Sequence, residues 1–99
     1  MTLHPDVQAL LVALRELQKF LEQHGQSFWS AKIAQAADEI ARSDSHGVRR
    51  FLGFFGGMGS LNDLYLIEGG RTLPVEQDRL DALRSNAYSL AQSLKNETF

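Results

Sequence analysis

Apolar residues recur through the first part of the chain at spacings that alternate between three and four. The series runs through Leu3, Val7, Leu10, Leu14, Leu17 and Leu21. Residues at these intervals lie on one face of an α-helix. Pro5 suits a first helical turn, where its missing N–H has no intrahelical partner, and Gly25 can end a helix in the left-handed conformation. The pattern predicts a helix over residues 4–24 with one face in the core.

A second helix is predicted to begin after Ser27. Trp29, Ile33 and Ile40 continue the helical spacing, so Trp29 is expected in the core. The polar run over residues 43–47 then interrupts the pattern.

A short third helix is expected after this break, since Asp44 and Ser45 can both cap it. Arg49 and Arg50 lie on its polar side. Its apolar side consists of Val48, Phe51, Leu52 and Phe55.

The next stretch is rich in glycine: six of the eight glycines fall between Gly53 and Gly70. Ser60 with Asp63 three residues later is the spacing of a capping box and indicates one short helical turn. Residues 64–67 could be extended, which an apolar run of four does not decide. Residues 68–71 predict a turn.

The last helix is expected to open near Pro74, with Asp78 and Asp81 on a solvated face near its start. Its apolar stripe is formed by Leu80, Leu83, Ala87, Leu90 and Leu94. The pattern as a whole predicts an all-α fold, a compact bundle of about four helices with a glycine-rich insert before the last helix. The first and last helices should pack side by side in a single domain over residues 1–99.

The composition of the chain argues against several kinds of partner and site. The chain has 99 residues, a formal net charge of −2 and no cysteine. This balance argues against a nucleic-acid or membrane-surface partner, and the lack of cysteine excludes disulfides and thiolate metal sites. No apolar run reaches the length of a membrane span and no leader pattern is visible, so a cytoplasmic protein is expected.

No catalytic or cofactor pattern stands out. His4, His24 and His46 lack the spacing of a helical metal site. The glycine-rich segment resembles a phosphate-binding loop, but it has no Lys-Ser/Thr ending and no ordinary strand before it. The favoured interpretation is a structural corner without cofactor or metal, formed by Gly56, Gly57, Gly59, Ser60, Asn62 and Asp63.

Residues 56–64, with the sequence GGMGSLNDL, are similar to a segment found in a family of small bacterial proteins of unassigned function. Members of that family run as a leucine-rich helix, a tryptophan-containing helix, this segment and a C-terminal helix opening around Asp-Ala-Leu-Arg. Here the tryptophan is Trp29 and the last pattern occupies residues 81–84. The resemblance implies no activity, cofactor or catalytic residue.

These patterns favour a non-catalytic protein-binding module, most specifically an immunity-type protein that neutralises a cognate bacterial toxin by occlusion. Phe28 lies off the apolar stripe and is the candidate anchor, while Arg42, Arg49 and Arg50 would orient an acidic partner. One alternative is a small-ligand or nucleotide-binding regulator that uses residues 56–63. Another is a self-associating structural protein that forms a homodimer.

Overall fold

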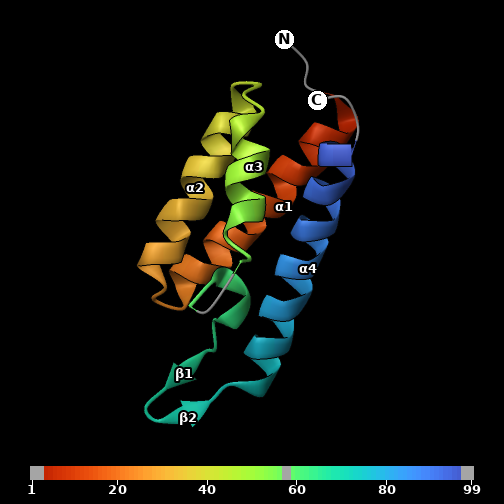
Figure 1. Ribbon diagram of the computed structural model, residues 1–99. Coiled ribbons are helices and arrows are strands. Elements are labelled where there is room, and N and C mark those ends of the chain that lie inside the picture. Colours follow the sequence, from red (N-terminus) through yellow and green to blue (C-terminus); the bar gives the residue numbers. More distant parts are fainter. Residues whose placement is uncertain (1–3, 57–58, 97–99) are drawn as a thin grey trace.

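A computed structural model describes residues 4–56 and 59–96. Its elements are α1 (Pro5–Gln23), α2 (Ser27–Ala41), α3 (His46–Gly53), a 3-10 turn η1 (Leu61–Asp63), β1 (Ile67–Glu68), β2 (Arg71–Thr72) and α4 (Pro74–Asn96). Successive helices run in opposite directions, and the two strands form a small hairpin at one end of the bundle (Figure 1). The all-α fold expected from the sequence is confirmed. No helix in the described ranges is long and apolar enough to cross a membrane.

The four helices enclose one apolar core. α1 and α3 each pack against both α2 and α4, so the expected pairing of the first and last helices is confirmed. Every described residue of the α1 stripe is buried, whereas Leu3 lies outside the described residues. Trp29, expected in the core, is half-buried and packs against its edge.

α1 and α2 end in the same capping motif. After α1, Gly25 has a φ of +70°, and the N–H of Gln26 donates to the Leu21 carbonyl at 2.8 Å. After α2, Ser43 takes the left-handed position with a φ of +62°. These Schellman-type ends satisfy carbonyls that the helices leave open. Both helix ends fall where the sequence predicts them, at Gly25 and at the start of the polar run over residues 43–47.

The start of α3 depends on a cap and on a close approach to α2. A carboxylate oxygen of Asp44 accepts a hydrogen bond from the backbone N–H of His46 at 3.0 Å. This bond, with a second to the His46 ring, lowers the pKa of Asp44. Gly47 lies so near α2 that a Cβ on it would be 2.6 Å from the Ala36 carbonyl oxygen. The short third helix is therefore held against α2 at a position that only glycine fits.

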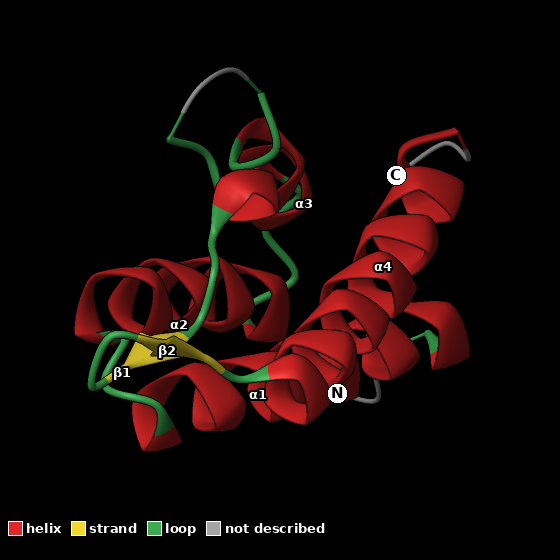
Figure 2. Ribbon diagram, turned by 90° about the horizontal axis from the view of Figure 1, so that it is seen from below, coloured by secondary structure: helices red, strands yellow, loops and turns green. Residues whose placement is uncertain are grey.

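The hairpin follows from two adjacent glycines. Gly69 and Gly70 have φ values of +58° and +76°, the conformation of a tight two-residue hairpin turn. Ile67 pairs with Thr72, and Glu68 pairs with Arg71. The turn expected at residues 68–71 is confirmed. Seen from below, the hairpin lies across the end of the bundle where α1 ends and α2 begins (Figure 2), and a Glu68 carboxylate oxygen is 3.8 Å from His24 Nδ1.

Candidate functional site

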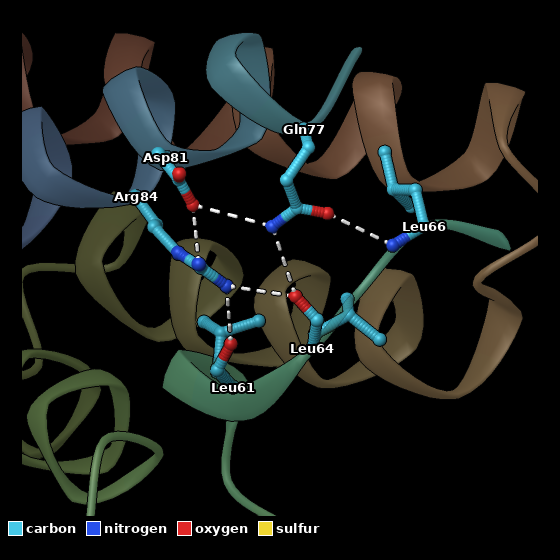
Figure 3. A network of polar contacts seen from close by, with 6 residues as sticks. All are labelled: Leu61, Leu64, Leu66, Gln77, Asp81 and Arg84. Atoms are coloured by element: carbon cyan, nitrogen blue, oxygen red, sulfur yellow. Dashed lines mark hydrogen bonds and ion pairs between the residues drawn. The ribbon is translucent and has the colours of Figure 1, made fainter. Parts of the chain in front are cut away.

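A buried arginine of α4 holds the segment that leads into the hairpin. Arg84 is only 8% exposed. Its Nη1 donates to the Leu61 carbonyl at 2.9 Å and to the Leu64 carbonyl at 3.2 Å. Its Nη2 donates to the carboxylate of Asp81 (Figure 3). The positive charge is thus compensated by one carboxylate and two backbone acceptors, as a buried charge requires.

Gln77 extends this contact by one helical turn. Its Nε2 donates to the Leu64 carbonyl and to Asp81, both at 3.3 Å, and its Oε1 accepts the Leu66 N–H at 2.9 Å (Figure 3). Gln77, Asp81 and Arg84 follow the i, i+4, i+7 spacing of one helix face. We call these three residues the α4 clamp. It ties residues 61–66 to the last helix.

The solvated face expected at Asp81 is only part of its environment. Half of its side chain is exposed, but its carboxylate accepts hydrogen bonds from both other members of the α4 clamp. Hydropathy alone assigns an aspartate and an arginine to the surface. Asp81 and Arg84 are the first and last residues of the Asp-Ala-Leu-Arg pattern at residues 81–84. That pattern is the sequence signal that could have pointed to this pair.

A cleft of about 330 Å³ lies beside the α4 clamp. It is lined by Phe55, Asn62, Arg84, Ser85, Tyr88 and Ser89. The rings of Phe55 and Tyr88 meet edge to face, with their centroids 4.8 Å apart. Asn62, expected to stabilise a turn, is exposed and faces this cleft.

The remaining corner residues form a tight turn around η1. The N–H of Gly59, whose φ is +73°, donates to a carboxylate oxygen of Asp63 at 3.1 Å. Ser60 is buried but makes no side-chain capping bond, so the capping box expected from its spacing to Asp63 does not form. The Asp63 carboxylate instead accepts the N–H of Gly59, the residue before Ser60. Gly56 is exposed, while Gly57 and Met58 lie outside the described residues.

Phe28 stands out on the surface as the sequence suggests. It is 64% exposed in the first turn of α2. Its ring meets Trp29 edge to face at 5.3 Å, and Lys32 Nζ lies 5.1 Å from its centroid. Contacts of both kinds fix an exposed ring in one orientation.

Other large apolar side chains are exposed at the same end of the molecule. Tyr65, which precedes β1, and Ile67, its first residue, lie on either side of buried Leu66 in the sequence, and Val75 lies in the first turn of α4. We call Phe28, Tyr65, Ile67 and Val75 the hairpin-end surface. It comprises four of the six large hydrophobic residues exposed within residues 4–56 and 59–96.

The structure does not bring the predicted basic group together with Phe28. Arg42 follows the last residue of α2 and Phe28 lies in its first turn, about 20 Å away along the helix. Arg50 forms an ion pair with buried Glu39, and Arg49 is exposed on α3. The basic side chain beside Phe28 is Lys32, which sequence reasoning did not select.

The histidines stay apart. His4 caps α1 by accepting the Asp6 N–H, His46 contacts Asp44, and His24 lies at the end of α1. No group of three or more potential metal ligands occurs in the part of the chain that the structure describes.

Comparisons with known proteins point to one family. Residues 22–74 match a family model described as a domain of unknown function, DUF6966. This region runs from the end of α1 to the first residue of α4, and it contains the hairpin, η1 and Phe28. No curated protein and no solved structure matches the chain significantly. Because the family model spans a little over half of the chain, the protein belongs to the DUF6966 family, whose function is unassigned.

Proposed function

We propose that this protein is a non-catalytic protein-binding module that contacts its partner through the hairpin-end surface. The observation that carries the proposal is that four exposed large apolar residues belong to segments at one end of the bundle: the start of α2, the hairpin with the residues leading into it, and the start of α4 (Figure 1). Contiguous exposed apolar surface is characteristic of interaction sites. Three of its four residues, Phe28, Tyr65 and Ile67, fall within residues 22–74, the region that matches the family. Val75 is the first residue after that region.

Phe28 has the properties of an anchor. Trp29 and Lys32 support its ring from the same helix, so little side-chain freedom is left to lose on binding. Trp29 in turn packs edge to face on Phe54 at the end of α3, with the ring centroids 5.6 Å apart. A rigid aromatic ring on a helix is the kind of residue on which binding energy concentrates.

The charges at this surface define the chemistry of the partner. Lys32 places a cation beside the exposed ring of Phe28. On the hairpin, Glu68 and Arg71 are paired across the two strands, so their charges offset one another. The complementary partner offers an apolar pocket for Phe28 with a carboxylate opposite Lys32.

The most specific form of the proposal is an immunity-type protein. A preformed surface on a folded helical domain can neutralise a bacterial toxin by occluding its active site, without chemistry of its own. An interface of ordinary size buries about 1,200–2,000 Å². Little backbone change is needed when the binding elements are already folded.

The test begins with the partner recovered by affinity purification from the native host and then purified separately. Titration calorimetry should show that Phe28→Ala weakens binding at least about tenfold, the effect expected of an anchor. Val12→Ala is the matched control, because Val12 is 57% exposed on α1 outside the hairpin-end surface. Equal affinities of the two variants would refute the proposed surface. A partner with no toxic activity when expressed alone would refute the immunity form and leave the binding role standing.

A further inference from the structure

The cleft beside the α4 clamp is lined by side chains of two kinds. Two are aromatic, Phe55 and Tyr88, whose rings are in contact. The others are polar: Asn62, Arg84, Ser85 and Ser89. The volume of about 330 Å³ falls at the lower end of the range for small-molecule sites, about 300–1,000 Å³.

Each polar residue of the lining can donate a hydrogen bond. The Asn62 amide and the two serine hydroxyl groups can also accept one, the Arg84 guanidinium only donates, and none of the described lining residues is acidic. Ser85 and Ser89 are four residues apart on α4, so their hydroxyl groups lie on the same side of the helix. A donor-only guanidinium beside groups that can all donate favours an anionic ligand group.

Arg84 retains donors for such a group. A guanidinium has five N–H groups, and three of those of Arg84 are used by Leu61, Leu64 and Asp81. Two are left without a protein acceptor among the described residues. Asp81 offsets part of the positive charge, but the clamp also holds the guanidinium in place before any ligand arrives.

We infer that this cleft binds a small molecule that carries a carboxylate or phosphate group on a flat apolar body. The anionic group accepts hydrogen bonds from Asn62, Arg84 and the two serines. The flat body packs against Phe55 and Tyr88, the two aromatic residues that line the cleft. This site shares no residue with the hairpin-end surface, so it is independent of the protein-binding proposal.

Three probes test the inference on the full chain labelled with ¹⁵N. Benzoate and phenyl phosphate supply the two anionic groups, and benzamide is a neutral molecule of the same shape as benzoate. We expect at least one anion to shift the backbone resonances of Asn62, Ser85 and Ser89, with benzamide binding at least about tenfold more weakly. A shift with one anion only supports the inference and identifies the group that the cleft accepts.

A pair of charge variants provides the control. Asn62→Asp places a negative charge in the cleft and should weaken anion binding at least about tenfold through repulsion and the loss of a donor. Asn86→Asp adds the same charge to an exposed position of α4 outside the cleft lining and should leave binding within about twofold. Thermal melting of both variants checks that the fold is kept. The inference is overturned if neither anion shifts these resonances, if benzamide binds as tightly as benzoate, or if the two variants behave alike.

Discussion

Replacing the buried arginine of the α4 clamp provides the sharpest test of how the segment before the hairpin is held. Arg84→Met removes the guanidinium but keeps an unbranched apolar stem of similar packing. The Leu61 carbonyl then loses the 2.9 Å bond from Nη1 and keeps only the 3.3 Å bond from the Leu64 N–H, whereas the Leu64 carbonyl keeps its bond from Gln77. The substitution therefore removes one buried hydrogen bond from a charged donor and one ion pair, and leaves both carbonyls with one donor each.

The magnitude follows from these two losses. A buried hydrogen bond from a charged donor contributes about 1.5–3 kcal/mol. The ion pair contributes at most about 1 kcal/mol, because half of the Asp81 side chain is exposed to water. We expect Arg84→Met to lower the free energy of unfolding by about 2–3 kcal/mol, a large share of the roughly 5–15 kcal/mol that stabilises a typical domain.

Urea unfolding followed by circular dichroism measures this change. Arg79→Met is the matched control, because Arg79 is an exposed arginine of the same helix. It should change stability by less than about 0.5 kcal/mol. If the two variants unfold at the same urea concentration, Arg84 does not hold residues 61–66 as described.

Two further predictions concern α3. Gly47→Ala should lower stability by about 1–3 kcal/mol, because its Cβ would lie 2.6 Å from the Ala36 carbonyl oxygen. Gly53→Ala, with no atom within 4 Å of the new Cβ, should be neutral or slightly stabilising when both variants are unfolded in urea. Equal losses at the two glycines would contradict the close approach of α3 to α2. The pKa of Asp44 is lowered from its usual 3.8 by the bonds to His46, so its stabilising contribution is present above pH 3.8 and is lost as the pH falls through the folded-state pKa. Asp44→Asn should therefore reduce the acid sensitivity of α3 helicity, and an unchanged pH profile would show that this cap is not responsible.

The sequence predicts the helices well because their signals are local. The three–four spacing of α1, the glycine after it and the paired glycines of the hairpin each act within a few residues. The capping motif after α2 is also local, but a serine, Ser43, takes the left-handed position that glycine takes after α1. Periodicity and chain breaks were therefore enough to locate all four helices.

The site was less predictable because its contacts are long-range. Arg84 bonds carbonyls about twenty residues earlier in the chain, and backbone acceptors leave no mark on a hydropathy pattern. The environment of Gly47 likewise depends on how α3 packs against α2. Phe28 is predictable because it lies off the buried stripe, whereas the position of the Lys32 ammonium group over its ring depends on a side-chain rotamer that the sequence does not specify.

Hydroxyl-radical footprinting of the protein, free and bound to its purified partner, tests most directly whether the hairpin-end surface is the binding site. Phe28 and Tyr65 are exposed and aromatic, and both should oxidise readily in the free protein. In the complex their oxidation should fall severalfold, while that of Tyr88, exposed on α4 outside this surface, stays unchanged. Unchanged oxidation of Phe28 and Tyr65 in a fully formed complex would show that the partner binds elsewhere.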